Sequence, residues 1–297
     1  MYNGIINIYK EKGFTSHDVV AKMRGICKQK KIGHTGTLDP DATGVLPVCL
    51  GSGTKLCDML TDKDKEYVAE LLLGKETDTQ DVTGQVLKES SVNCTEEEVR
   101  QVIMSFVGDY MQIPPMYSAL KVDGKKLYEL ARAGKEVERA ARPVKILDIE
   151  ILEVNLPVVK MRVECSKGTY IRTLCHDIGQ KLGCGGTMQS LKRTKVGIFK
   201  LEDAITLAEL EKLRDEDRIG DKLYVVDSIF EECPALHAKE DTIRLLENGN
   251  SFYPNQMEEK KTYPSGEWVR VYGKERFFGI YAYDSETRRY KPVKMFL

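Results

Sequence analysis

One loop of this 297-residue chain combines a carboxylate with backbone constraints that could hold it ready for chemistry. Residues 33–40, GHTGTLDP, place two glycines ahead of Asp39 and a proline directly after it. Glycine permits backbone geometry that is closed to other residues, and proline restricts the residue before it to extended backbone. A carboxylate held in this way suits a nucleophile or a general base. Aspartate before proline is also typical of a simple turn, so the segment alone leaves both interpretations open.

A second candidate segment, residues 165–174 (CSKGTYIRTL), brings an arginine to the start of a helix. The segment leaves a predicted strand, turns at Gly168 and enters a predicted helix, so that Tyr170 and Arg172 lie near the helix N-terminus. The planar guanidinium of Arg172 could pair with a loop carboxylate or with a phosphate. The alternative is an ordinary surface arginine.

A third segment interleaves basic and aromatic side chains. It starts at residues 114–121, PPMYSALK, and continues through Gly124, Tyr128 and Arg132. This mixture is typical of surfaces that hold backbone phosphates and stack unpaired bases. An amphipathic helix with Tyr128 in the core is the alternative interpretation.

Motifs for cofactor and metal chemistry are missing. The sequence contains no Walker A motif, no G-x-G-x-x-G after a strand, no G-x-S-x-G and no H-E-x-x-H, and GSGTK at 51–55 lacks the P-loop spacing. The eight cysteines form no C-x-x-C pair and no cluster with the four histidines. This pattern argues against a zinc site and a disulfide framework and favours a reducing cytoplasm. We therefore expect neither a metal nor a cofactor.

The net charge of −1 hides an uneven distribution. Residues 114–200 carry 17 Lys and Arg against 9 Asp and Glu, whereas residues 201–233 carry 4 against 11. Such segregation allows a local phosphate-binding face on a nearly neutral protein, although an uneven solvated surface is the alternative. No apolar run is long enough to span a membrane, and the N-terminus lacks the basic-then-apolar order of a signal peptide.

The elements expected to position these segments alternate without a regular βαβ rhythm. Hydrophobic spacing predicts helices that start near Thr15, at a Thr95–Glu98 capping box, over 125–133 and over 170–182. Alternation or short apolar runs predict strands over 4–9, 67–73, 144–154 and 158–165. Five glycines and two prolines predict that residues 33–53 form a structured loop. The expected fold class is α+β, a mixed and largely antiparallel sheet flanked by helices.

The composition of the sequence changes near Pro234, from an acidic stretch to short aromatic segments. The acidic stretch 201–233 is predicted to be helical, and short aromatic strands follow it at 268–272, 277–283 and 292–297. These patterns predict a catalytic domain over 1–233 and a small β-rich domain over 234–297.

Five segments occur in the order seen in the TruB family of bacterial tRNA pseudouridine-55 synthases, which this chain resembles densely over residues 1–200. They are GHTGTLDPDATGVLPVCLGSGTKL, the KEY of 65–67, PPMYSALKVDGKKLYELARAG, KGTYIRTL and LKRTKVGIF. The C-terminal part resembles the PUA RNA-binding module more weakly, through 268–272 and 277–283. Departures from the family pattern are Asp41, Ser52-Gly53 and Thr187-Met188-Gln189, and the last puts local loop contacts in doubt.

The resemblance implies a pseudouridine-synthase-like fold and a cytoplasmic enzyme that isomerises the uridine at position 55, in the T-arm of tRNA, without a cofactor or a protein partner. Asp39 matches the family's nucleophile, which attacks C6 or C1′ of the target nucleoside. Tyr67 matches the tyrosine that stacks on the target base and is placed to help proton removal, and Arg172 matches the arginine that pairs with the aspartate. The base must leave the RNA stack to reach them. Further matches concern substrate contacts: Tyr170 and Leu191 in the pocket wall, His34 in the space vacated by the base, and Lys121 in the phosphate grip.

Two other classes remain as alternatives. A non-catalytic RNA-binding protein of the same ancestry would keep the fold without the chemistry, against which the presence of Asp39, Tyr67 and Arg172 argues. A glycoside hydrolase would need a second, acidic carboxyl group about 5–9 Å from the first, and no other motif supplies an obvious one.

Overall fold

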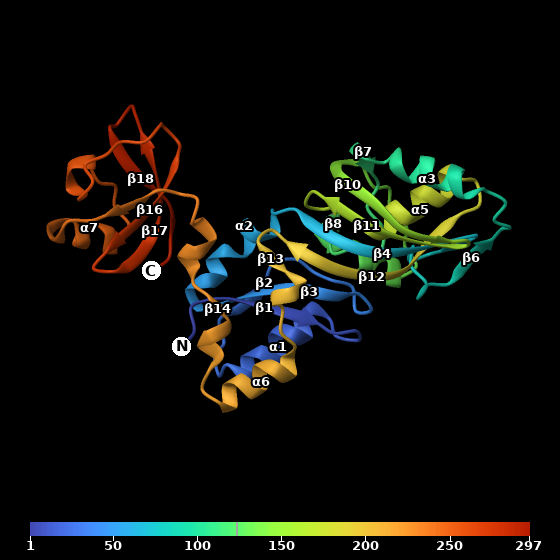
Figure 1. Ribbon diagram of the computed structural model, residues 1–297, viewed down its shortest axis with the longest axis horizontal. Helices are drawn as coiled ribbons and strands as arrows, with labels where there is room; N and C mark the ends of the chain where they lie inside the picture. Colours follow the sequence, from blue (N-terminus) through green and yellow to red (C-terminus); the bar gives the residue numbers. More distant parts are fainter. Residues whose placement is uncertain (123) are drawn as a thin grey trace.

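A long twisted sheet and a smaller C-terminal sheet organise the protein (Figure 1). The computed structural model describes residues 1–122 and 124–297. Along the ten-stranded main sheet the order is β14-β1-β3-β12-β4-β11-β10-β7, with β2 paired to β3 and β13 paired to β12. All of its described pairings are antiparallel except that of β3 with β12. The predicted α+β class with a largely antiparallel sheet is therefore confirmed.

The strands of the main sheet come from the whole length of the chain before residue 225. They are β1 (Gly4–Lys10), β2 (Ile32–His34), β3 (Thr43–Leu50), β4 (Lys65–Leu73), β7 (Gly108–Gln112), β10 (Arg142–Asn155), β11 (Val158–Cys165), β12 (Gly186–Val196), β13 (Phe199–Lys200) and β14 (Leu223–Tyr224). Two small hairpins stand apart from it, β5 (Lys75–Thr77) with β6 (Val86–Glu89) and β8 (Lys121–Val122) with β9 (Lys125–Lys126).

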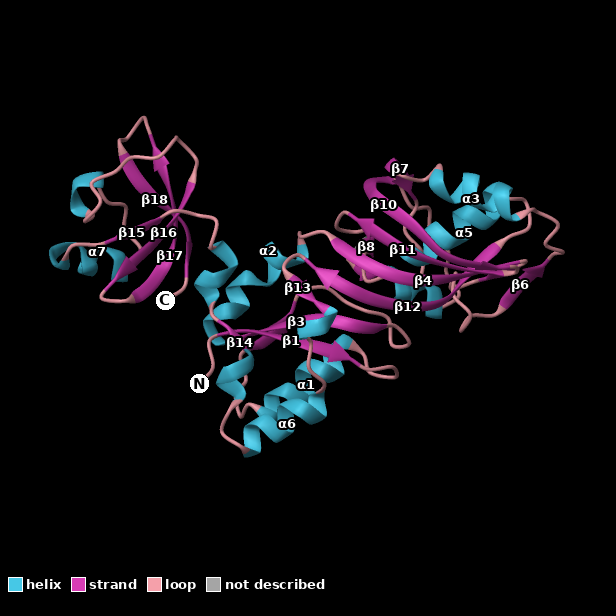
Figure 2. Cartoon of the chain, in the orientation of Figure 1, coloured by secondary structure: helices cyan, strands magenta, loops and turns pink. Residues whose placement is uncertain are grey.

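Helices cover each half of this sheet separately (Figure 2). Helices α1 (Ser16–Ile26) and α6 (Leu207–Asp215) share an apolar cluster with β1, β2 and β3. Helices α3 (Glu96–Met104) and α5 (Ile171–Lys181) share another with β4, β10 and β11. The short helices are α2 (Cys57–Thr61), α4 (Leu127–Arg132) and α7 (Ile243–Glu247). The two halves meet at the parallel β3–β12 pair, which has only two register contacts.

Local sequence signals explain why several elements form where predicted. Thr15 caps α1 and Thr95 caps α3, and each makes a reciprocal capping box with the acidic residue three positions later. Strand β11 buries alternate residues, as its sequence pattern predicted. The predicted strands at 4–9, 67–73, 144–154 and 158–165 all exist, with small shifts of their ends.

Two predictions about elements are wrong, and one strand was not predicted. Residues 33–53 are not one loop, because they contain the end of β2, all of β3 and the start of a 3₁₀ helix at Gly51–Leu56. Strand β3 is buried along almost all its length, so its apolar run decides its conformation in spite of its glycine and proline. Strand β12 was not predicted: two irregularities in its pairing with β4 break the alternation on which prediction depends. The 201–233 stretch is only partly helical, with α6, short 3₁₀ turns and β14.

The C-terminal sheet has the order β15-β16-β17-β18, from β15 (Ala235–His237), β16 (Trp268–Gly273), β17 (Arg276–Asp284) and β18 (Arg289–Met295). It encloses an aromatic core of its own and lies at one end of the elongated molecule (Figure 1). Phe277 and Phe296 of this unit also join an apolar cluster with Ile5, Cys49 and Leu56 of the main body. Within the described residues no helix is long and apolar enough to cross a membrane.

Candidate active site

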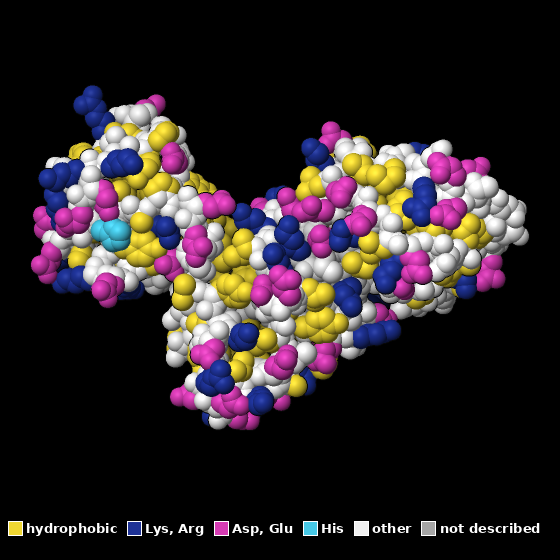
Figure 3. Space-filling view, viewed as in Figure 1, with side chains coloured by type: hydrophobic (Ala, Val, Ile, Leu, Met, Phe, Trp, Pro, Cys, Tyr) yellow, Lys and Arg dark blue, Asp and Glu magenta, His cyan; other side chains and the backbone are white. Residues whose placement is uncertain are grey.

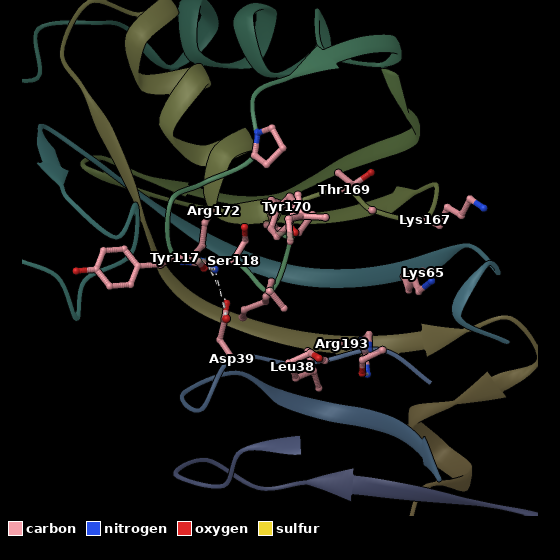
Figure 4. Close-up of a pocket in the computed structure, with 18 of the residues that line it drawn as sticks. Leu38, Asp39, Lys65, Tyr117, Ser118, Lys167, Thr169, Tyr170, Arg172 and Arg193 are labelled. Atoms are coloured by element: carbon pink, nitrogen blue, oxygen red, sulfur yellow. Dashed lines mark hydrogen bonds and ion pairs between the residues drawn. The ribbon is translucent and has the colours of Figure 1, made fainter. Parts of the chain in front are cut away.

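A cleft of about 1040 Å³ opens where the two halves of the main sheet meet. Its lining comes from the Asp39 loop, strands β4, β10 and β12, the start of α5, and the segments around residues 79–83 and 112–120. Five of the seven sequence-predicted site residues line it: Asp39, Tyr67, Arg172, Tyr170 and Leu191. Figure 4 shows Asp39 and Arg172 facing each other across this cleft.

The Asp39 loop is fixed on both sides by hydrogen bonds to other elements. The amide of Leu38 donates to Ser16 Oγ of α1 at 2.9 Å. Lys10 Nζ, fully buried at the end of β1, donates to the carbonyl of Pro40 at 3.0 Å. Gly36 has φ +109°, a conformation that glycine adopts without strain. The loop therefore presents the Asp39 side chain, 38% exposed, from a backbone that is held in place.

Arg172 binds both oxygens of the Asp39 carboxylate. Its Nε lies 3.0 Å from Oδ2, and its Nη2 donates to Oδ1 at 3.4 Å. The guanidinium is only 6% exposed and is held by the carbonyls of Thr79 and Tyr117, at 3.0 and 2.8 Å. Arg172 follows the turn at Gly168 (φ +79°) and lies in the first turn of α5. The sequence expectation of an arginine paired with a loop carboxylate is thus realised in the fold.

Asp81 is a second carboxylate beside Arg172, and sequence reasoning did not identify it. Its Oδ2 lies 3.8 Å from Arg172 Nη1. Its Oδ1 accepts hydrogen bonds from the hydroxyl of Thr79 at 2.8 Å and from the amide of Thr83 at 3.0 Å. Asp81 lies in a turn flanked by threonines, DTQDVTG at 78–84, and this was the only local signal.

The electrostatic environment of Asp39 balances burial against one strong ion pair. Burial in the cleft raises the pKa of Asp39 above its ordinary range, the guanidinium of Arg172 opposes that rise, and the nearby Asp81 adds to it. A carboxylate with a raised pKa is more basic, and so more nucleophilic in its ionised form, than an ordinary one.

Tyr67 lies on β4 with its ring in the cleft wall and is 8% exposed. Its register partner on β12 is Arg193, a fully buried cation that also lines the cleft. Burial raises the pKa of Tyr67, and the charge of Arg193 works against that rise. Arg193 is another residue that sequence reasoning missed.

Tyr170 is the residue directly before α5, and Gln112 fixes its backbone. The amide of Tyr170 donates to Gln112 Oε1 at 2.7 Å, and Gln112 Nε2 donates back to the Tyr170 carbonyl at 3.0 Å. Leu191 of β12 completes the apolar part of the wall. These two residues lie where a pocket wall was expected.

His34 does not line the cleft. It ends β2, and its ring meets that of His17 edge-on at 5.6 Å between centroids. His17 does line the cleft, so His34 lies behind it. Burial lowers the pKa of His34, and its Nδ1 is buried without a hydrogen-bond partner among the described residues.

The basic and aromatic segment forms the rim of the cleft. Lys121 is exposed on the β8–β9 hairpin, one residue beyond Leu120, which lines the cleft. Tyr128 also lines the cleft rather than the core, and Lys126 and Arg132 lie near its ring, 5.4 Å from the centroid in each case. The alternative of a core tyrosine at 128 is therefore wrong, because Leu127 takes the buried position.

The arrangement suits chemistry by a carboxylate on a planar, stackable substrate. The Asp39 carboxylate, the Tyr67 ring and the guanidinium groups of Arg172 and Arg193 line one cleft large enough for a nucleotide and its neighbours. Among the described residues, no group of His, Cys, Asp and Glu side chains could hold a metal ion. The face shown in Figure 3 carries Lys and Arg side chains intermixed with Asp and Glu.

Family models match most of the main body. The model of the TruB family pseudouridylate synthase N-terminal domain matches residues 24–171, and that of the tRNA pseudouridylate synthase B C-terminal domain matches residues 172–230. The tRNA pseudouridine synthase B of Lachnoclostridium phytofermentans is 54% identical, with 99% of this chain and 100% of that protein covered. That of Alkaliphilus oremlandii is 47% identical, with 99% and 97% covered.

Solved structures give the same result. A chain in a crystal structure of a Cbf5–Nop10–Gar1 complex is 28% identical and superposes with a TM-score of 0.74, covering 99% of this chain and 85% of that one. A chain of an H/ACA RNP bound to a substrate RNA containing 2′-deoxyuridine is 26% identical with a TM-score of 0.73, at 99% and 85% coverage. Family models, full-length relatives and fold agree, and the chain belongs to the TruB family of pseudouridylate synthases.

Proposed function

We propose that this protein converts the uridine at position 55, in the T-arm of tRNA, to pseudouridine, with Asp39 as the nucleophile. One observation carries the proposal: the Asp39 carboxylate, held by both oxygens on the buried Arg172, faces a cleft whose wall includes Tyr67. The relatives named as tRNA pseudouridine synthase B support tRNA as the substrate.

The reaction is an isomerisation and balances without a cofactor. The C1′–N1 bond of uridine breaks, the base turns within the cleft, and a C1′–C5 bond forms. A proton leaves C5 and N1 gains one, so the product has the formula of the substrate. Asp39 attacks either C6 or C1′ and keeps base or sugar attached to the protein meanwhile. Arg172 holds the carboxylate in position for that attack, and Tyr67 stacks on the base and helps to remove the C5 proton.

Access to the cleft requires that the target base leaves the RNA stack. The rim formed by Lys121, Lys126, Tyr128 and Arg132 combines cations with an aromatic ring, which suits phosphates and an unpaired base. His34, behind His17 at the edge of the cleft, is proposed to fill the space that the base vacates. Tyr170 and Leu191 are proposed to enclose the flipped base.

We also propose the division into a catalytic domain over 1–233 and an RNA-binding, PUA-like domain over 234–297. The separate sheet and aromatic core after Pro234 support it, and every proposed catalytic residue precedes position 200. We expect the enzyme to work in the cytoplasm and to act on tRNA without a partner protein.

A direct test incubates the purified protein with an unmodified tRNA transcript and maps pseudouridine by nucleotide. Modification at position 55 is expected, both in tRNA and in an isolated T-arm stem-loop, and a transcript with cytidine at 55 serves as the control. Modification of another uridine would refute the T-arm assignment. Binding without modification would favour a non-catalytic RNA-binding protein.

Rising salt should weaken binding steeply, because several phosphate contacts release counterions. A flat response to salt would contradict the proposed phosphate grip. A glycoside hydrolase with Asp81 as its second carboxyl group would instead release free uracil, which the same incubation detects.

A further inference from the structure

Arg193 is a cation in the interior of the main sheet that the proposed mechanism leaves without a role. Its side chain is 1% exposed. Nε donates to the carbonyl of Val45 at 2.7 Å, and Nη2 donates to the carbonyl of Gly36 at 3.3 Å. Among the described residues no ion pair joins it to a carboxylate, and the side chain that offsets its burial is Tyr67. A buried cation without a carboxylate partner is costly, which suggests that function maintains it.

The contacts of Arg193 reach both sides of the loop that carries Asp39. Gly36 lies three residues before Asp39, and Val45 lies six residues after it. Gly44 has φ +106°, and a Cβ there would come within 2.1 Å of the carbonyl oxygen of Arg193, so the loop lies directly against β12. Figure 4 shows Arg193 beside Leu38, at the foot of the cleft. One guanidinium thus holds the loop at its beginning and just beyond its end.

Arg193 and Tyr67 are register partners on β12 and β4, and both line the cleft. The side chains of directly opposed residues on neighbouring strands project from the same face of a sheet. The guanidinium therefore lies beside the side chain of Tyr67. The positive charge also favours the ionised form of Tyr67, whereas Cys165 and Asp39 favour the neutral form.

We propose that Arg193 is a positioning residue for this reaction: it holds the loop that carries Asp39 beside Tyr67, and it places a positive charge next to Tyr67 that stabilises the phenolic oxygen during proton transfer with the base. The proposal rests on the proposed function, in which Tyr67 helps to remove the C5 proton. It adds a buried residue that acts through both the loop and Tyr67.

The decisive experiment reads the state of Tyr67 itself. We would place 3-fluorotyrosine at position 67 of the full-length protein and follow its ¹⁹F resonance with pH, without RNA. Arg193→Met should raise the titration midpoint by about one pH unit, because the cation that favours the ionised form is gone. The resonance at pH 7.5 should also move, because the ring loses the charge of its cross-strand neighbour.

A matched control is needed because Arg193 also acts on other groups, lowering the pKa of Lys10, His34 and Lys65. Lys195→Met removes a cation from the same strand, but Lys195 pairs with Glu164 at 3.4 Å and does not line the cleft. It should leave the Tyr67 titration unchanged. An equal shift in both variants would show a general charge effect and overturn the proposal.

Activity gives the second measurement. Arg193→Met should lower kcat about 100-fold and change KM less than about threefold, because a side chain that is 1% exposed offers almost no surface to bound RNA. Arg193→Lys keeps the charge but lacks the planar guanidinium that bonds to the carbonyls of both Val45 and Gly36. It should lower kcat about tenfold.

If Arg193→Met fails to fold, the lysine variant decides. Wild-type kcat in a folded Arg193→Lys protein would overturn the proposal, as would an unchanged fluorotyrosine signal in a folded Arg193→Met protein. The fluorotyrosine titration needs no turnover, so it remains readable even if the proposed function fails in the tRNA assay.

Discussion

Among the described residues, the cleft region buries charged side chains, whereas the C-terminal sheet buries none. The buried charged side chains of the described residues are Lys10, Lys65, Arg172 and Arg193, and all four line the cleft or lie beneath it. The C-terminal unit buries none, and its core is built from aromatic rings such as Phe252, Tyr281 and Tyr290. Burial lowers the pKa of Lys10 and of Lys65 to about 8, because their surroundings disfavour the charged form.

This difference shows which region has been shaped for chemistry. Apolar and aromatic packing stabilises a fold at little cost, whereas buried cations reduce stability unless they hold something in place. Lys10, Arg172 and Arg193 bond to Asp39 or to the loop that carries it, and Lys65 lines the same cleft, so buried positive charge is concentrated there. Such a concentration of charge suits a polyanionic substrate and a base that becomes negative when its glycosidic bond breaks.

Removal of the Asp39 charge should have the largest effect on the cleft. Asp39→Asn keeps the size and the turn-forming ability of the side chain but lacks the anionic oxygen. We expect turnover to fall by about 10⁴-fold or more, with tRNA affinity close to wild type. Release of tritium from C5 of labelled uridine is the readout, since C5 loses its hydrogen when the new bond forms. Substantial release by a folded variant would make Asp39 a turn residue only.

Replacing the planar guanidinium of Arg172 should have the next largest effect. Arg172→Lys retains a cation but cannot bind both carboxylate oxygens and the carbonyls of Thr79 and Tyr117 together. We expect kcat to fall about 100-fold and the melting temperature to decrease. Arg142→Lys, at an exposed arginine of the same cleft, is the control for melting temperature and should melt like wild type. Equal melting temperatures for wild type, Arg172→Lys and Arg142→Lys would show that the Arg172 guanidinium does not stabilise the site.

The pH dependence should separate activity from stability. Because the pKa of Asp39 is raised in the folded protein, activity should be lost as pH falls through that raised value. Folding stability should respond with the opposite sign. Between the ordinary and the raised pKa the folded state binds the proton more tightly, so the contribution of Asp39 to stability increases as pH falls through this window.

Arg172→Lys should move the acid limb of activity to higher pH, because a weaker partner opposes the effect of burial less. Asp39→Asn should remove the corresponding segment of the stability curve, measured by urea unfolding at several pH values. An acid limb in wild type at the pH of an ordinary, exposed aspartate would contradict this assignment.

Loss of the C-terminal unit should have the smallest effect on the chemistry. A chain ending at Cys233 should keep kcat within about threefold at saturating tRNA, while KM rises about tenfold. The truncation also uncovers the cluster that Phe277 and Phe296 share with the main body, at about 2 kcal/mol of stability for each buried ring.

A milder variant tests the docking alone. Lys55→Met removes the hydrogen bonds from Nζ to the carbonyls of Met295 and Leu297, at 3.1 and 3.0 Å, and keeps both units. It should change KM slightly and kcat not at all. A loss of kcat in either folded protein at saturating RNA would show that the two regions share the catalytic work.

Local sequence signals predicted the parts of the site that depend on local structure. Thr15 and Thr95 identify helix starts, Gly168 identifies the turn before Arg172, and the apolar alternation of β11 identifies its buried face. The pairing of Asp39 with Arg172, 133 positions apart, came from types of side chain and from family resemblance.

The residues that were missed are defined by tertiary contacts. In the sequence, Arg193 is one of several basic residues in LKRTK, and only the pairing of β12 with β3 shows that it is buried. Lys10 resembles a surface lysine at the end of a strand, but it is also buried. The sequence around Asp81 indicates only a polar turn, whereas the fold brings its carboxylate to 3.8 Å from Arg172. A polar residue in sequence carries no sign of its burial, so the charged floor of the cleft could not be predicted.

The parallel contact between β3 and β12 has a consequence during synthesis of the protein. Lys192 and Arg193 pair with Thr43 and Gly44, so the cleft joins the beginning of the chain to a strand made much later. Contacts this distant in sequence form slowly, because a long loop must close first. A chain still on the ribosome without β12 has Asp39 but lacks Leu191 and Arg193. The nascent protein therefore lacks part of the cleft wall until β12 has been made and has paired with β3.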